Sequence, residues 1–172
     1  MYRSETNNFS ILLKNLSDFP KLNLPPAHLH VRQSDDGVMR VYCPLRRRFV
    51  ALTPEEWVRQ HFVHYLTENL GYPGPLLANE VSITLNSTSR RCDTVLYSPQ
   101  GLKPIMIIEY KAPHINITQE VFDQIVRYNM VLQVPVLIVS NGLSHYCCTI
   151  DYAARAVRFL PSIPPYASLS AY

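Results

Sequence analysis

The stretch Pro104-Ile105-Met106-Ile107-Ile108-Glu109-Tyr110-Lys111 decides the fold prediction for this chain. Its apolar part is short and rich in β-branched residues, so we expect a buried strand that ends in charged residues. Side chains alternate along a strand, and Glu109 and Lys111 should therefore leave the same face. A carboxylate and an ammonium group at the end of a core strand are costly to bury without partners or a chemical task. This strand end is the first candidate for a functional site.

A second predicted strand, residues 91–97, brings Asp93 close to the same end of the sheet. Two carboxylates and one lysine that converge there are the groups expected of a Mg²⁺ site with a lysine that handles water. The alternative is a solvated Asp93 on the strand and a surface ion pair between Glu109 and Lys111. The spacing alone leaves both interpretations open.

The composition indicates a folded chain, because 47% of its 172 residues are hydrophobic and only 17% are charged. No apolar run approaches the roughly 18 to 20 residues that a transmembrane helix needs, and no signal-peptide pattern follows Met1. We therefore expect a cytoplasmic protein with no membrane partner. The four cysteines lack metal-ligand spacing and should be buried, reduced thiols. The net charge of +3 permits a nucleic-acid partner but does not demonstrate one.

Two helices are predicted from their capping residues. Thr53 is a good N-cap, Pro54 suits the first turn, and Glu56 is placed to complete a capping box. Thr118 caps the second helix in the same way. The first helix carries an apolar stripe at helical spacing, made of Val58, Phe62, Tyr65, Leu66 and Leu70.

The remaining segments predict strands. We expect a hairpin from residues 28–33 and 38–43, an antiparallel pair from 77–85 and 91–97, further strands at 135–139 and 145–150, and an edge strand at 157–160. The fold class is α/β, with helices covering a central mixed sheet. The predicted domains are an N-terminal arm and hairpin over 1–43, the main domain over 44–160, and a poorly ordered, Pro-containing C-terminal tail over 161–172.

Asp93, fifteen intervening residues and then Glu109-x-Lys111 resemble the signature of the PD-(D/E)XK nucleases. Gln124 and Tyr128 lie four residues apart on the second helix and resemble the Q-x-x-x-Y motif of the RecB-like branch of that superfamily.

The chain from about residue 40 to 142 more closely resembles the N-terminal nuclease domain of type I restriction enzyme R subunits. The resemblance implies a restriction-endonuclease-like core. Those subunits continue into an ATP-driven translocase, but this sequence has no Walker-type phosphate loop. We therefore expect a stand-alone copy of the nuclease module without ATP dependence. The resemblance rests on residues 44–48, 53–60, 91–93, 108–113, 124–129 and 141–142.

The resemblance implies a Mg²⁺-dependent DNA endonuclease of restriction, defence or repair, in which Mn²⁺ would substitute for Mg²⁺. Asp93, Glu109 and the backbone carbonyl of Tyr110 would bind the metal. Lys111 would orient or deprotonate the attacking water. Gln124 would position Lys111 or the phosphate.

Other residues carry two interpretations each. Glu56 is either a capping residue or a further metal ligand, and Tyr128 either supports the site and touches DNA or belongs to the core. Glu80 is interpreted as structural or as a solvated edge residue. Arginines on two segments either grip DNA phosphates or are solvated, and Lys103 is placed near the same metal end. These arginines are Arg46, Arg47, Arg48, Arg90 and Arg91.

The alternative function is a non-catalytic module that retains the nuclease fold and binds nucleic acid or a protein. The intact Asp93, Glu109 and Lys111 favour the enzyme. The lack of a motor or a visible target-recognition domain favours the binding module or a required accessory subunit. A homodimer, with the arm as its contact, would let two sites cut two strands.

Overall fold

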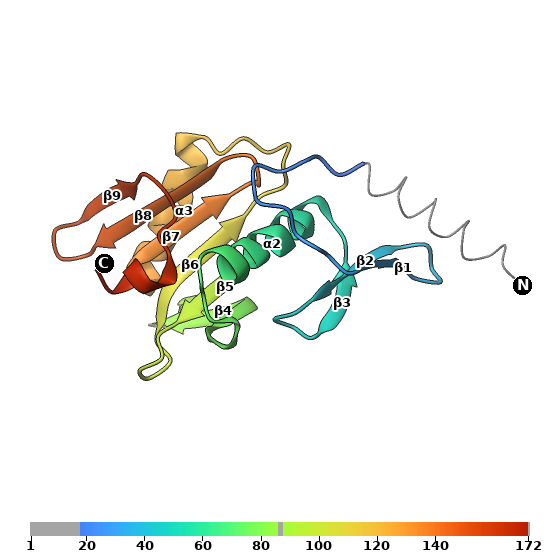
Figure 1. Cartoon of the computed structure of the whole chain (residues 1–172). Helices are drawn as coiled ribbons and strands as arrows, with labels where there is room; N and C mark the ends of the chain where they lie inside the picture. The colour runs from blue at the N-terminus through green and yellow to red at the C-terminus, as the bar shows by residue number, and fades with distance from the viewer. Residues whose placement is uncertain (1–17, 86–87, 172) are drawn as a thin grey trace, which may run out of the picture.

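The computed structural model describes residues 18–85 and 88–171, and their strands form two sheets (Figure 1). In the larger sheet the spatial order of the six strands follows the chain. Only β6 and β7 run parallel, and helix α3 (Gln119–Leu132) connects them. The mixed sheet with the Glu109 strand near its centre confirms the predicted α/β class. Its strands are β4 (Leu77–Leu85), β5 (Thr88–Tyr97), β6 (Pro104–Tyr110), β7 (Val136–Ser140), β8 (His145–Asp151) and β9 (Ala156–Leu160).

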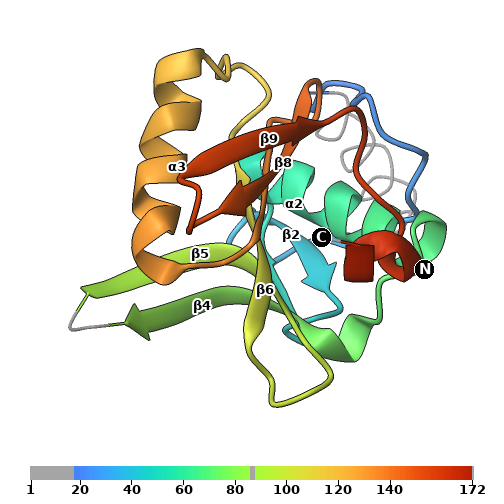
Figure 2. The same ribbon diagram turned by 90° about the vertical axis from the view of Figure 1, so that its left-hand side faces the viewer.

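The six-stranded sheet is covered on both faces. Helix α2 (Pro54–His64) continues as a π-helix, η1 (Tyr65–Asn69), and lies on the opposite side of β6 from α3 (Figure 2). Met106 and Ile108 of β6 belong to the core cluster that contains Phe62 of α2. Ile107 belongs to the cluster that contains Phe122 of α3. The strand is apolar from Pro104 to Ile108 because both of its faces are buried there.

Both predicted N-caps are present. The Thr53 hydroxyl accepts a hydrogen bond from the Glu56 N–H at 3.1 Å, and Thr118 caps α3 from the Val121 N–H at 3.3 Å. The predicted capping box is wrong, because in the described structure the Glu56 carboxylate binds Arg59 rather than returning to the Thr53 N–H. A buried guanidinium is a stronger partner for a carboxylate than a backbone amide. No helix in the described ranges is both long and apolar enough to cross a membrane.

A second, three-stranded antiparallel sheet precedes α2. It consists of β1 (Val31–Gln33), β2 (Met39–Cys43) and β3 (Arg48–Ala51). The β1–β2 hairpin confirms the prediction, and Gly37 takes φ of 79° in its turn. Strand β3 was not predicted, because Phe49-Val50 is too short an apolar run to signal a strand. This sheet spans the predicted boundary at residues 43 and 44, and the domain limits stay a prediction.

The C-terminal segment packs onto the core, and the expectation of a poorly ordered tail is wrong for residues 161–171. Ile163 is buried in the core cluster of α2. The Tyr72 hydroxyl donates a hydrogen bond to the Pro164 carbonyl at 2.8 Å, and a 3₁₀-helix, η3 (Tyr166–Ala171), follows. Proline restricts the unfolded chain, so ordering such a segment costs less entropy. The prolines therefore favour this packed arrangement.

The four cysteines are buried thiols, as expected. Cys147 faces the core cluster of α2, and Cys148 faces that of α3. Burial raises the pKa of each of these two thiols to about 12. They are core residues in protonated form.

Candidate functional site

Asp93 lies where the ladders on both sides of β5 are interrupted. The β4–β5 ladder skips the position at which Glu80 and Asp93 would pair, and Glu80 has a left-handed backbone with φ of 58°. The β5–β6 ladder ends at Thr94–Ile108, one residue short of Asp93. The Asp93 carboxylate accepts a hydrogen bond from the Tyr110 N–H at 2.8 Å. A non-glycine residue at positive φ in a strand is uncommon and marks this position as a candidate site.

Four carboxylates converge on the guanidinium of Arg59, which is only 3% exposed. Two come from its own helix, one from β4 and one from β5. Arg59 Nη1 lies 2.5 Å from Glu56 Oε2 and 2.9 Å from Glu80 Oε1, while Nη2 lies 3.1 Å from Asp93 Oδ1 and 3.5 Å from Glu55 Oε1. Arg59 is the cation at the centre of an acidic cluster.

Further polar groups surround these carboxylates. Arg46 Nη2 lies 3.4 Å from Glu56 Oε2, and Gln60 donates a hydrogen bond to Glu56 Oε1 at 2.7 Å. Arg91 forms an ion pair with Glu80 at the exposed margin. Both oxygens of Glu56 are therefore engaged by neighbouring side chains.

The electrostatics of the cluster favour the charged form of Arg59 and disfavour that of Glu55. Burial alone lowers the pKa of Arg59, but the carboxylates of Glu56 and Asp93 raise it above its ordinary value. Burial and the charge of Asp93 raise the pKa of Glu55, and the positive charges of Arg59 and Lys111 oppose this increase. The charge of Lys111 therefore acts on the same cluster.

The structure brings Asp93 against the backbone of β6 at the residue that follows Glu109. Glu109 is buried at 7% exposure, and strand alternation places it on the α3 side with Ile107. The Tyr110 ring is fully buried, and the Arg59 guanidinium carbon lies 5.6 Å from its centroid. Lys111 is half-buried beyond the end of the strand. The expected common face of Glu109 and Lys111 stays a prediction because β6 ends between them.

Three predicted side chains lie outside what the structure describes. Gln124 and Tyr128 belong to α3, and Arg90 belongs to β5, but only the backbones of these residues are described. Their proposed contacts with Lys111 or with DNA stay predictions.

The predicted basic residues occupy three different environments. Arg47 and Arg48 are exposed, whereas the Arg46 side chain is 17% exposed and forms an ion pair with Glu56. Arg91 is 69% exposed and remains accessible beside the cluster. The placement of Lys103 near the metal end is wrong, because it lies in the β5–β6 turn, at the opposite end of these strands from Asp93.

Sequence reasoning missed Arg59 and underestimated Glu80. A signal for Arg59 was present in its spacing, since it follows Glu55 and Glu56 by four and three residues on one helix face. Arg59 also precedes Phe62 and Leu66 of the predicted apolar stripe by three and seven residues, which places it on their helix face and indicates burial. Glu80 gave no comparable signal, because its contact with Arg59 depends on the backbone turn within β4.

The oxygen ligands available at this site are those expected for a hard divalent cation that is bound by few protein groups. Within residues 18–85 and 88–171, no three His, Cys, Asp or Glu side chains are arranged as a metal-binding cluster. Mg²⁺ commonly uses one or two carboxylates and retains several waters. Asp93 and Glu109, which the β5–β6 register would place opposite each other one step beyond Thr94–Ile108, are two such carboxylates. Arg59 already takes one oxygen of Asp93.

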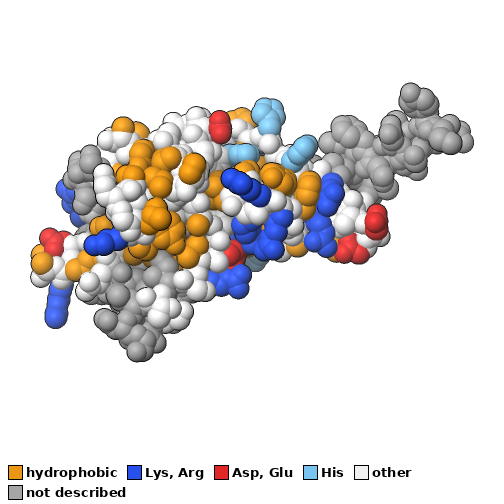
Figure 3. Space-filling view, turned by 90° about the horizontal axis from the view of Figure 1, so that it is seen from below, with side chains coloured by type: hydrophobic (Ala, Val, Ile, Leu, Met, Phe, Trp, Pro, Cys, Tyr) orange, Lys and Arg blue, Asp and Glu red, His pale blue; other side chains and the backbone are white. Residues whose placement is uncertain are grey.

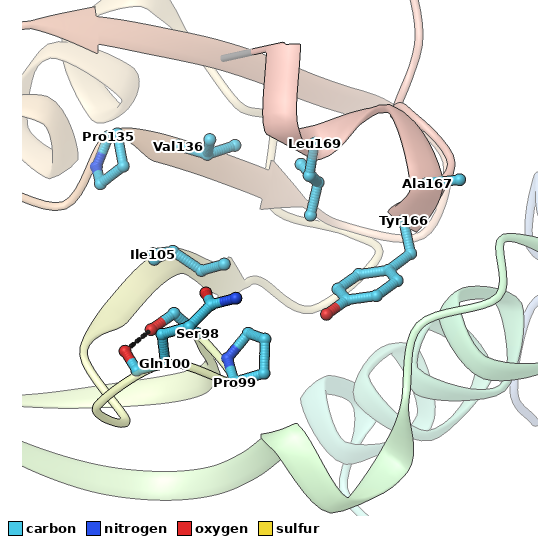
Figure 4. A pocket seen from close by; sticks show the side chains of 9 residues that line it. All are labelled: Ser98, Pro99, Gln100, Ile105, Pro135, Val136, Tyr166, Ala167 and Leu169. Atoms are coloured by element: carbon cyan, nitrogen blue, oxygen red, sulfur yellow. Dashed lines mark hydrogen bonds between the residues drawn. The ribbon is translucent and has the colours of Figure 1, made fainter.

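A separate cavity of about 460 Å³ lies at the other end of the six-stranded sheet (Figure 4). It is formed by the turn after β5, the start of β6 and β7, and η3. Its lining contains no acidic, basic or cysteine side chain, so it offers no catalytic group comparable with the Asp93 site. The residues are Ser98, Pro99, Gln100, Ile105, Pro135, Val136, Tyr166, Ala167 and Leu169.

Residues 54–164 match the family described as "Type I restriction enzyme R protein N terminus (HSDR_N)". The chain belongs to this family. Membership confirms the resemblance drawn from the motifs, and the matched region of this R-protein N-terminal domain begins with α2, after β1–β3. No curated protein sequence matches the chain.

A solved structure supports the restriction-endonuclease-like fold of this R-protein domain. It is a fragment of a putative HsdR subunit of a type I restriction enzyme from Vibrio vulnificus YJ016, with a TM-score of 0.51 and 19% sequence identity. The similarity covers 70% of this chain and 25% of that fragment, so the chain spans only a quarter of its relative. At this identity, the likeness shows the fold.

Proposed function

We propose that this chain is a Mg²⁺-dependent DNA endonuclease domain that hydrolyses phosphodiester bonds. The observation that carries the proposal is the interrupted ladder at Asp93, whose carboxylate accepts a hydrogen bond from the Tyr110 N–H, between Glu109 and Lys111 in the chain. Because the β5–β6 ladder ends before Asp93, the Tyr110 N–H binds this carboxylate and brings it to the strand end that carries Glu109 and Lys111. Family membership supports a restriction-system role.

In this proposal Asp93, Glu109 and the Tyr110 carbonyl hold the metal, with Glu56 as a further candidate. Bound Mg²⁺, or Mn²⁺ in its place, would polarise the scissile phosphate and acidify a water. Lys111 orients that water or neutralises charge that develops on the phosphate. The buried side of the site excludes bulk solvent and strengthens these interactions.

Arg59 adds a condition to metal binding. Its Nη2 group donates to Asp93 Oδ1, and the Tyr110 N–H occupies Asp93 Oδ2. A metal at Asp93 must share an oxygen with one of these donors or displace it. Arg59 retains Glu56 and Glu80 as partners, so it can release Asp93 while its charge stays compensated.

The same contact favours a second candidate function, a non-catalytic module that binds nucleic acid or a protein. A guanidinium that neutralises the carboxylates permanently would stabilise the fold without a metal. Under this alternative Arg59 is structural, and divalent cations do not bind.

The test is incubation of the purified protein with supercoiled plasmid and labelled linear DNA in Mg²⁺, Mn²⁺ or EDTA. Asp93→Asn and Lys111→Ala remove the proposed groups, and Arg158→Met on exposed β9 serves as the control. We expect metal-dependent cutting by the native chain and the control, and none by the two site variants. Cutting that persists in folded Asp93→Asn would refute the assignment. Absence of both cutting and Mn²⁺ binding would favour the non-catalytic module.

The partners follow from the same proposal. DNA is the substrate, and a homodimer or an accessory protein subunit would supply the second cut or the target recognition. No role for ATP and no membrane partner is proposed. A cytoplasmic location stays a prediction.

A further inference from the structure

The β1–β3 sheet has one face that is buried and one that is rich in arginine and aromatic side chains. Val41 and Cys43 of β2 are fully buried. Strand alternation directs the intervening residues to the other face. There the register places Arg32 opposite Arg40 and Tyr42 opposite Phe49. We call this face the basic sheet face, defined by Arg32, Arg40, Tyr42 and Phe49.

The side chains on the basic sheet face contact each other. The guanidinium carbon of Arg32 lies 3.9 Å from the Phe49 ring centroid, and the Tyr42 ring meets Phe49 edge-on at a centroid distance of 5.4 Å. Stacking on Phe49 fixes the guanidinium plane while its N–H groups stay accessible, because Arg32 is exposed. A guanidinium that is fixed in position but still exposed to solvent is suited to bind a phosphate.

Positive charge dominates this part of the surface. Arg47 and Arg48, both exposed, follow on the β2–β3 connection and the start of β3. The hairpin tip carries Asp35 and Asp36, and Asp36 is paired with Arg40 at 3.2 Å. Seen from below, Lys and Arg side chains gather near the middle of the molecule, with few acidic side chains among them (Figure 3). This distribution is complementary to a polyanion.

The basic sheet face is connected to the Asp93 site through the chain. Strand β3 ends at Ala51, and α2, which carries Glu56 and Arg59, begins at Pro54. Arg46, in the connection between β2 and β3, reaches back to Glu56. The buried face of the sheet contacts Asn79, next to Glu80, through Cys43, so the basic sheet face is turned away from the carboxylate cluster. A ligand bound there would reach the cluster around the connection that carries Arg46.

We propose that the basic sheet face binds a single DNA strand and leads it toward Asp93. Arg32 and Arg47 contact phosphates, and the planes of Arg32 and Tyr42 stack against unpaired bases. Only the destination of the strand rests on the proposed nuclease function. Binding itself requires no metal and no cleavage.

The test is fluorescence anisotropy of a labelled 20-nucleotide DNA strand with the full chain in EDTA at several salt concentrations. Arg32→Glu reverses one charge of the face, Arg32→Lys keeps the charge but loses the planar group, and Arg158→Glu makes the same reversal on β9. We expect Arg32→Glu to weaken binding about tenfold and to lower the salt slope by about one unit. Arg32→Lys should lie between Arg32→Glu and the native chain, and Arg158→Glu should bind as the native chain does.

The proposal is overturned if the native chain fails to bind the strand, or if folded Arg32→Glu loses no more affinity than Arg158→Glu. Circular dichroism establishes that each variant is folded. Binding in EDTA that depends on Arg32, together with the absence of both cutting and Mn²⁺ binding in the metal-containing assay, would support the basic sheet face and refute the nuclease. Metal-dependent cutting by the native chain, combined with normal DNA binding by Arg32→Glu, would support the nuclease and refute the basic sheet face.

Discussion

Removal of the Arg59 guanidinium should both destabilise the protein and increase its response to divalent cations. Arg59→Met keeps an unbranched side chain of similar reach but leaves Glu56 and Asp93 without their shared cation. The side chains of Arg59 and Glu56 are only 4% and 6% exposed, so the ion pair is a buried one. Loss of one partner of such a pair costs about 3 to 5 kcal/mol of unfolding free energy. For a chain of this size the melting temperature should fall by roughly 6 to 20 °C.

A divalent cation should recover part of that loss. Binding at 100 times the dissociation constant stabilises a folded protein by about 2.7 kcal/mol. In the native chain the cation should increase the unfolding free energy by less, because Arg59 already binds an oxygen of Asp93. The assay is thermal unfolding followed by circular dichroism in EDTA, Mg²⁺ and Ca²⁺, for the native chain, Arg59→Met and the surface control Arg158→Met.

Two results would refute this reasoning. If Arg59→Met melts in EDTA within 2 °C of the control, as expected for a loss of less than about 1 kcal/mol, the carboxylates do not depend on Arg59. If divalent cations raise the melting temperature equally in both chains, Arg59 does not compete for Asp93. The readout needs no cleavage, and it therefore separates cation binding from catalysis.

Three further predictions concern the fold around the site. Gly142 has φ of 82°, and an added Cβ would lie 2.7 Å from a Leu22 methyl, so Gly142→Ala should lower the unfolding free energy by about 2 to 4 kcal/mol. Gly74→Ala, with open space around it, is the control in urea unfolding and should change little. Burial lowers the pKa of His145, so native stability should decrease as the pH falls below the ordinary histidine pKa of about 6.5 and level off below the folded pKa. In His145→Gln the unfolding free energy should decrease less as the pH falls. If its dependence on pH is the same as in the native chain, His145 does not cause the decrease. Cys147 and Cys148 should resist a thiol reagent at pH 8 until the protein unfolds, because their pKa is raised to about 12, and rapid native labelling would refute their burial.

Local patterns were sufficient to predict much of the fold. The apolar run before Glu109 identified the central strand, and Thr53 and Thr118 identified both helix starts, because each signal lies within a few residues. Strand β3 escaped prediction, since its pairing with β2 rather than its composition makes it a strand. The packing of Ile163 likewise depends on a core built by distant elements.

The candidate site was predictable only in part, because it too depends on contacts between segments that are distant in the sequence. The spacing between Asp93 and Glu109 matched a motif, and the structure places Asp93 just beyond the end of the β5–β6 ladder. The Arg59 cluster combines side chains of α2, β4 and β5, and its geometry requires the left-handed backbone at Glu80. A linear pattern does not contain that convergence. Of the four carboxylates around Arg59, the sequence named Asp93 and Glu56 as site candidates, but it did not name the cation that lies among them.

The single parallel pairing of the large sheet divides its assembly into two stages. Strands β4–β6 and β7–β9 each form a meander of neighbouring antiparallel strands, whereas β6 and β7 pair across the whole of α3. Local contacts form faster than contacts that close a long loop, so each meander should assemble before the two halves join. Asp93 and Tyr110 both belong to the first half. The hydrogen bond that shapes the candidate site can therefore form before the sheet is complete, while the buried environment that gives the site its chemistry appears only when the halves dock.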